Sequence, residues 1–464
     1  MNIFFILPLV VILIIAIINL NWRQWVKGVL LIIIIDGALR KWFLPQASNL
    51  IYFFKDFVLI VAYIKYFLLP HKQHSLINNH GVSFFHGFIS LCSIWLIFQS
   101  FNPDLGSPII GLFGLSRYLL YVPLIWMLPY LFNSEEELYK FLRNYLLILI
   151  PVCILGIFQF LSPPSSIINI APGGEEASEV LGFGDGKLRI SSVFSFPNLY
   201  TTYLTISFGL ILPFLTKKQS LIWQKIILVE IFLMIANFFM TGARGVFVFA
   251  FLLLVAYLGI KTFNQLKAVV KIIKKLAIPT IIGVILLIQW FAPAIDAFST
   301  RIDDPGSGSE MSTRIVNAFS INSVPGKSFI DGYGTGSTQS GSKALQRVFK
   351  LPESLPTPPV EDEIDRITVE IGQFGAILWY GMRIALLITL WSIYQNLKSP
   401  FLKDLALVTF LLHIVLLPTQ VVVHPVANVY YWFLSGFIFL LPRLERKNFY
   451  ENNDLSMFTL HRQL

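Results

Sequence analysis

The sequence predicts an all-α fold, a polytopic transmembrane helical bundle of about 13 helices with a large extracytoplasmic loop. Composition is the first reason: 55% of the 464 residues are hydrophobic and only 13% are charged, whereas about a quarter of the residues in a soluble domain are charged. In addition, apolar stretches of about 20 residues, the length that crosses a bilayer, recur from residue 3 to residue 442. Clusters of lysine and arginine separate several of these stretches.

Two long polar segments divide the predicted helices into three groups. The predicted parts are N-terminal transmembrane helices in residues 1–161, an extracytoplasmic loop in 162–192, central transmembrane helices in 193–294, a large extracytoplasmic loop in 295–366, and C-terminal transmembrane helices with a cytoplasmic tail in 367–464. Loops of more than about 15 residues in a compact protein are usually functional or disordered. The glycine-rich stretch around Gly332, Gly334 and Gly336 is expected to be flexible.

The positions of the basic residues predict the orientation in the membrane. Arg443, Arg446 and Lys447 follow the last predicted span, and lysines fill a predicted connection at residues 261–275. Lysine and arginine are enriched in cytoplasmic loops, so we expect both regions to be cytoplasmic. Counting spans back from this end places the two long polar loops outside a plasma membrane.

Several other function classes find little support in the sequence. The net charge of +9 is explained by the basic loops, so no nucleic-acid partner is expected. Cys92 and Cys153 fall within predicted spans, and no Cys/His cluster with metal-ligand spacing occurs. The acidic run from Glu361 to Asp365 suits a helix start better than a cation site. We therefore expect neither a metal nor another cofactor.

Arginines at the outer edge of the predicted bundle are the first candidates for a functional site. Arg244 lies in TGARG between two predicted spans, where small neighbours allow close approach to the guanidinium. An anion site and a snorkelling arginine in a helix turn are equally good explanations of this residue. Arg189 and Arg314 are weaker candidates, since each by itself fits a solvated loop charge.

The segment EDEIDRITVEIGQFG carries a second set of candidates. Glu363, Arg366, Glu370 and Gln373 follow a spacing that places them on one face of a helix. That face leads into an apolar span, where ionisable side chains usually face the bundle interior or a watery cavity. The alternative is a charge-paired helix start. His424, which precedes a proline, is a minor candidate.

From residue 185 to residue 440 the chain resembles the O-antigen ligase and polymerase superfamily of bacterial envelope glycosyltransferases. The resemblance rests on the order of four pieces: RISSVFSFPNLYTTYL entering a helix, TGARG at a helix boundary, an outer loop with TRIVNAFS and PGKSFIDGYGTGS, and VEIGQFGAILWYG. The N-terminal GALRKWFLP and KDFVLIVAY resemble segments of some exopolysaccharide polymerases.

This resemblance implies a metal-independent glycosyltransferase of the bacterial plasma membrane, with its active site facing the periplasm or the cell exterior. Its substrate would be an undecaprenyl-diphosphate-linked oligosaccharide within the lipid bilayer. Arginine binds phosphate oxygens bidentately, so Arg244 and Arg314, supported by Arg189 or Arg366, would hold the pyrophosphate. Glu363 and Glu370 are the candidates for the base that deprotonates the acceptor hydroxyl.

Three functions stay open at this stage. The first is a polymerase of O-antigen, capsule or exopolysaccharide repeat units, with a chain-length regulator and a flippase as possible partners. The second is an O-antigen ligase that transfers glycan to lipid A-core or protein; many ligases of the superfamily carry a His-Asn pair where this chain has EDEID, which favours the polymerase. The third is a polysaccharide flippase or other transporter, although the sequence shows no internal repeat of the kind common in transporters.

Overall fold

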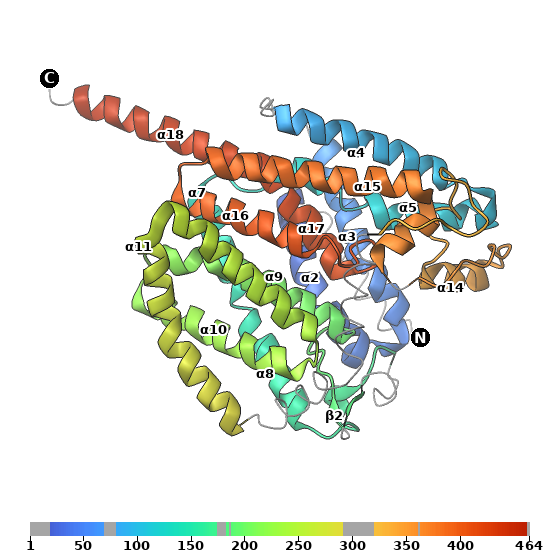
Figure 1. Cartoon of the computed structure of the whole chain (residues 1–464), viewed down its shortest axis with the longest axis horizontal. Helices are drawn as coiled ribbons and strands as arrows, with labels where there is room; N and C mark the ends of the chain where they lie inside the picture. Colours follow the sequence, from blue (N-terminus) through green and yellow to red (C-terminus); the bar gives the residue numbers. More distant parts are fainter. Residues whose placement is uncertain are drawn as a thin grey trace.

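The computed structural model describes residues 19–68, 80–173, 182–184, 187–290, 320–360 and 362–461. Within these ranges the protein is a bundle of helices with one two-stranded β-hairpin, formed by β1 (Gly182–Gly184) and β2 (Lys187–Leu188) (Figure 1). The first predicted span, at residues 3–20, lies almost entirely outside the described residues. Arg314 also lies outside them.

Helices fill both halves of the described chain. In the first half they are α2 (Trp22–Ala38) with a π-helical turn at Leu39–Phe43, α3 (Ser48–Leu68), α4 (His80–Gln99), α5 (Pro108–Leu119), α6 (Leu124–Met127), α7 (Glu135–Leu146) and α8 (Leu149–Leu161). In the second half they are α9 (Pro197–Thr216), α10 (Leu221–Met240), α11 (Arg244–Trp290), α14 (Ser340–Phe349), α15 (Glu363–Asn396), α16 (Pro400–Val415), α17 (Pro425–Ser435) and α18 (Phe437–His461).

A polytopic membrane bundle agrees with the length and composition of these helices. In the described residues, seven helical segments are long and apolar enough to cross a membrane: Pro108–Tyr130, Glu135–Leu161, Pro197–Thr216, Leu221–Met240, Arg244–Phe263, Glu363–Asn396 and Pro425–Phe449. The predicted number of about 13 spans is therefore not confirmed. Helices α2 and α16, with 17 and 16 residues, are shorter than these segments.

The region around residues 261–275 differs from the prediction. We expected a cytoplasmic connection there between two spans, at residues 244–260 and 276–294, but the first stretch and the described part of the second, up to Trp290, belong to the single helix α11. Residues 261–275 contain neither glycine nor proline, and lysine favours a helix. Figure 1 shows α11 changing direction where its colour passes from yellow-green to yellow.

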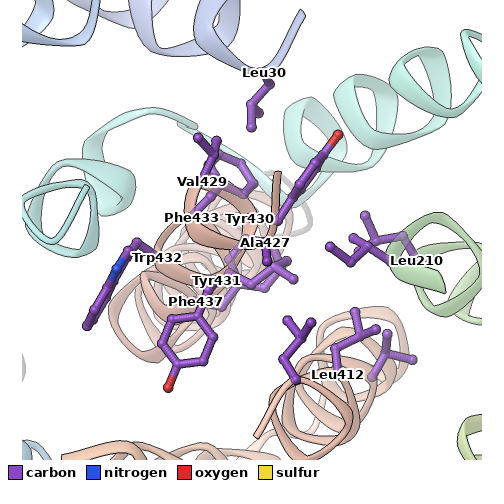
Figure 2. Close-up of a cluster of buried hydrophobic side chains, with 14 of the residues drawn as sticks. Leu30, Leu210, Leu412, Ala427, Val429, Tyr430, Tyr431, Trp432, Phe433 and Phe437 are labelled. Atoms are coloured by element: carbon purple, nitrogen blue, oxygen red, sulfur yellow. The ribbon is translucent and has the colours of Figure 1, made fainter. Parts of the chain in front are cut away.

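The core of the bundle surrounds the short helix α17. Tyr430, Trp432 and Phe433 of α17 lie among side chains of neighbouring helices such as Leu30 of α2 and Leu412 of α16, each of them at most 3% exposed (Figure 2). Packing on all sides fixes α17 and therefore the residues that immediately precede it.

Helix α15 is interrupted near its start by Gly372. The backbone angles there are φ 76° and ψ 167°, a conformation that glycine adopts at little cost. The break exposes backbone groups that find partners elsewhere: Phe374 N donates to Phe329 O at 3.0 Å, and Trp95 Nε1 donates to Ile371 O at 2.9 Å. Gln373 lies beyond this break, so the predicted helix face does not continue undisturbed into the membrane span.

Residues 329–339, which we call the docked loop, fill the space beside this break. Tyr333 N donates to Val369 O at 2.8 Å, and Gly334 N donates to Glu370 O at 2.9 Å. A Cβ atom at Gly332 would lie 2.5 Å from Glu370 O, too close for any other residue. The expectation of a flexible loop here was wrong, because the glycines permit close backbone approach to α15.

The other side of the docked loop contacts α4 and α5. Thr335 Oγ1 donates to Gly111 O of α5 at 2.9 Å, and Thr335 N donates to Gln99 O, at the end of α4, at 3.3 Å. At Gly114 an added Cβ would lie 2.2 Å from Thr335 C. The loop is therefore held between three helices, and it leads directly into α14.

Candidate functional site

A cavity of about 630 Å³ opens between the docked loop, α14, the starts of α3 and α17, and α5. Three guanidinium groups line it, those of Arg40, Arg117 and Arg366, and we call it the arginine cavity. None of the described residues that line it is an aspartate or a glutamate. Much of the remaining wall is apolar, contributed by Phe53, Phe113, Phe196, Leu199, Leu345, Val348 and Val423.

Arg40 reaches the cavity from the π-helical turn after α2. Its Nε donates to Ser48 Oγ at 3.0 Å, and its Nη1 donates to Ser195 Oγ at 3.0 Å. Its Nη1 also lies 3.8 Å from Asp36 Oδ2, four residues earlier in the chain. Partners on three sides fix the direction of this guanidinium, so little freedom is left to lose when a ligand binds.

Arg117 of α5 is held by an acidic residue behind the cavity wall. Its Nη2 lies 2.7 Å from Asp56 Oδ2 of α3, and Tyr121 donates to the other oxygen of the same carboxylate. The ring of Tyr52, which also lines the cavity, lies 5.3 Å from the Arg40 guanidinium and 5.8 Å from that of Arg117. The Tyr52 ring is therefore close enough for a cation–π interaction with each of the two guanidinium groups.

Arg366 approaches from α15 on the opposite side. Its Nη1 donates to the backbone oxygen of Thr338 at 3.0 Å and to Thr338 Oγ1 at 2.9 Å. Its Nε is buried and has no hydrogen-bond partner among the described residues. The docked loop therefore supplies the contact that orients Arg366.

Glu370 also holds Thr338 in place. It is fully buried, and its Oε1 accepts a hydrogen bond of 2.6 Å from Thr338 Oγ1 while its Oε2 accepts one of 2.9 Å from Tyr118. Glu370 does not line the arginine cavity. It reaches the cavity only through Thr338, which lies between this carboxylate and Arg366.

Glu363, the other predicted catalytic carboxylate, holds the turn that precedes α17. Its Oε1 accepts from Val421 N at 2.9 Å and from Val422 N at 2.8 Å, and its Oε2 is buried without a hydrogen-bond partner among the described residues. The side chain is 1% exposed. Because this turn leads to His424, Glu363 helps to set the position of that histidine.

His424 lines the cavity and caps the N-terminus of α17. Its Nδ1 accepts from Ala427 N at 3.1 Å, which leaves Nε2 as the protonated nitrogen of the neutral ring. Nε2 lies 3.4 Å from Thr202 Oγ1. Burial lowers the pKa of His424 to about 4, so near neutral pH the ring is an uncharged hydrogen-bond donor.

The predicted arginines fall into two groups. Arg189 and Arg244 lie near the turn between α10 and α11, where Arg189 Nε donates to Thr241 O at 2.9 Å. Neither lines the arginine cavity. The segment from Arg189 to Ser195 connects this turn to the arginine cavity, because Ser195 accepts a hydrogen bond from Arg40. A segment of six residues spans at most about 20 Å.

Sequence reasoning missed Arg40 and Arg117 as site residues. The arginines that the sequence indicated were Arg189, Arg244, Arg314 and Arg366. Arg40 and Arg117 are both ionisable residues within long apolar stretches, and this property alone marks a residue as a functional candidate in a membrane protein.

The described residues contain no group of three or more His, Cys, Asp or Glu side chains arranged to hold a metal ion. The arginine cavity is instead suited to an anion, which its donors can bind directly. The chain matches no model of a known protein family and no curated protein.

Proposed function

We propose that this protein is a membrane glycosyltransferase that polymerises lipid-pyrophosphate-linked oligosaccharide repeat units into O-antigen, capsule or exopolysaccharide. The observation that carries the proposal is the convergence of Arg40, Arg117 and Arg366 on one largely apolar cavity. These residues come from three distant parts of the sequence. Asp56 pairs with Arg117 and Asp36 with Arg40 from outside the cavity, and no carboxylate is among the described residues that line it.

The shape and chemistry of the cavity suit a polyprenyl diphosphate. A pyrophosphate offers several oxygens to planar guanidinium groups, each of which can bind two of them. Phe53, Phe113 and Val348 form part of a wall on which isoprenoid units can pack. The anionic head of a polyprenyl diphosphate therefore matches the arginines, and its apolar chain matches the apolar wall.

The same groups have a role in the transfer reaction. An acceptor hydroxyl attacks the anomeric carbon of the donor sugar, a new C–O bond forms, and the bond to the lipid pyrophosphate breaks. Negative charge then grows on the departing pyrophosphate, and the three guanidinium groups and the Nε2–H of His424 stabilise it. The hydroxyl proton passes to a base; Glu363 and Glu370 remain the predicted bases, although each is also placed to position a residue of the cavity.

The location of the cavity agrees with an extracytoplasmic reaction. Figure 1 shows α14, which forms one wall, at the opposite end of the molecule from the C-terminus. The basic residues after the last span predict a cytoplasmic C-terminus. On that orientation the arginine cavity faces outward, where lipid-linked repeat units are joined.

The proposal is tested with purified protein in lipid nanodiscs and a synthetic polyprenyl-diphosphate oligosaccharide. The wild-type protein should lengthen the glycan and release polyprenyl diphosphate, whereas Arg117→Lys should bind and react poorly. Arg446→Lys, at an exposed position near the C-terminus, is the matched control and should behave as wild type. Equal activity of Arg117→Lys and wild type would contradict the proposal.

Loss of the protein in cells separates a polymerase from a ligase. Without a polymerase, single repeat units still reach the final acceptor through a separate ligase. Without a ligase, long glycan stays on the lipid carrier and none reaches the acceptor. We expect the first pattern; long carrier-linked glycan in the deletion strain would identify a ligase instead.

A further inference from the structure

A second cavity lies beside the arginine cavity. Its volume is about 440 Å³, and we call it the polar cavity. Apart from Ala344, its described lining is polar: Ser337, Thr338, Gln339, Ser340, Lys343, Arg347 and Thr357. Thr338, Gln339, Ser340 and Ala344 line both cavities, so the start of α14 forms a shared wall.

Helix α14 presents a different surface to each cavity. Leu345 and Val348 line the arginine cavity, whereas Lys343 and Arg347 line the polar cavity. Residues four apart lie above one another on a helix, so the two cations belong to one face. This division into an apolar face and a basic face follows directly from the sequence SGSKALQRVF.

Two buried polar atoms of residues that line the polar cavity have no hydrogen-bond partner among the described residues. Gln339 is 6% exposed, and its Nε2 has no hydrogen-bond partner among the described residues; the same is true of Ser337 Oγ. Gln339 is also the N-cap residue of α14 and makes no side-chain capping bond. Buried donors normally have partners, and a helix N-terminus favours a negative group.

The charge of the polar cavity is one-sided. Lys343 and Arg347 are exposed, and the described residues that line the cavity include no carboxylate. Hydroxyl and amide side chains make up most of the remaining lining. Such a surface matches a ligand that has many hydroxyl groups and a negative charge.

We propose that the polar cavity binds a carboxylate-bearing sugar of the substrate glycan, and that the polymer is therefore an acidic polysaccharide. This inference rests on the proposed function, because it assigns to the substrate's saccharide the cavity next to its pyrophosphate. In a lipid-linked saccharide the sugar is attached directly to the pyrophosphate. The two cavities are likewise next to each other, because Thr338 and Ser340 line both of them. Lys343 and Arg347 bind the carboxylate, and Gln339 and Ser337 bind hydroxyl groups.

The test measures binding of free oligosaccharides to the full chain in nanodiscs of uncharged lipid. Oligogalacturonate is the acidic probe, and a maltooligosaccharide of the same length is the neutral one. We expect the wild-type protein to prefer oligogalacturonate, and Lys343→Gln/Arg347→Gln to bind it about tenfold more weakly, the effect of two exposed ionic contacts. Lys350→Asn is the matched control, because Lys350 ends the same helix with a positive φ, which asparagine tolerates, and lines neither cavity.

Other outcomes would overturn the inference. Equal affinity for both probes, or unchanged affinity in the double variant, would show that the polar cavity does not select acidic sugars. If oligogalacturonate binding is lost when the nanodiscs that hold the protein contain phosphatidylglycerol, Lys343 and Arg347 bind lipid headgroups instead. Arg347→Gln alone serves if the double variant does not fold. Binding of polyprenyl diphosphate to the arginine cavity is measured in parallel, so failure of the sugar site is distinguished from failure of the proposed function.

Discussion

The two groups of arginines in this protein differ in what surrounds them. Arg40, Arg117 and Arg366 come from three separate segments and line one cavity, whereas Arg189 and Arg244 lie at a helix turn near Thr241. The sequence analysis singled out Arg189, Arg244 and Arg366, but neither Arg40 nor Arg117. A residue can therefore be prominent in the local sequence without lining the cavity, and a residue that lines the cavity need not be prominent in the sequence.

The guanidinium groups of the cavity group are also preorganised. In the cavity group, each guanidinium is oriented by oxygen atoms of its neighbours, such as Asp56 for Arg117 and Thr338 for Arg366. Such preorganised charges are worth more to a transition state than charges that must be arranged during the reaction. We therefore expect activity to depend most strongly on the cavity group.

The largest effect is expected for Arg366→Lys. Lysine keeps the charge but loses the planar fork that contacts Thr338 and a phosphate at the same time, so transfer should fall by about 1,000-fold. The measurement is kcat of glycan extension in nanodiscs, together with thermal stability to confirm folding. Activity within a few-fold of wild type would remove Arg366 from the pyrophosphate site.

Glu370→Gln should have a smaller effect if this residue acts through Thr338. The amide keeps the size and one acceptor oxygen but disturbs one of the contacts with Thr338 and Tyr118, so we expect kcat to fall by about 10- to 100-fold. The pH profile of the residual activity should keep its shape. A complete loss of transfer with intact binding of the lipid diphosphate would identify Glu370 as the base.

Arg244→Lys is expected to lower transfer by about tenfold, less than the change at Arg366. This side chain lines no part of the arginine cavity, and its effect would pass through the chain from Arg189 to Ser195 that contacts Arg40. Rates for both variants are compared in the same assay. A loss as large as that of Arg366→Lys would show that both groups act on one substrate.

The smallest effect concerns acid stability and His424. The folded pKa of about 4 lies below the value of about 6.5 for an unperturbed histidine, so the unfolded chain binds more protons between these values. The free energy of unfolding should therefore decrease as the pH falls from 6.5 to 4, by at most about 1.4 kcal/mol per pH unit.

Thermal unfolding of wild type and His424→Asn across this range checks the contribution. Asparagine can still cap α17 but does not titrate, so the variant should show a shallower slope with pH. Identical slopes would mean that His424 is not the group responsible.

The sequence by itself determined the class of protein and several local features. Its composition and apolar stretches predicted a helical membrane bundle, because a bilayer selects for long apolar helices. The acidic residues before α15 predicted a helix start, and the helix begins at Glu363 with Asp362 as its N-cap. Asp36 and Arg40 are four residues apart, a spacing that favours an ion pair on a helix, and they form one. Each of these features depends on residues that are close together in the chain.

Only the tertiary structure decided which distant residues meet. Neither the break at Gly372 nor the packing of the docked loop can be read from periodicity, because both depend on the approach of backbones that are far apart in the sequence. The same approach brings Arg40 and Arg117 opposite Arg366, and turns α14 into a wall between two cavities. Local patterns set the helices and the membrane, whereas close packing between helices created the site.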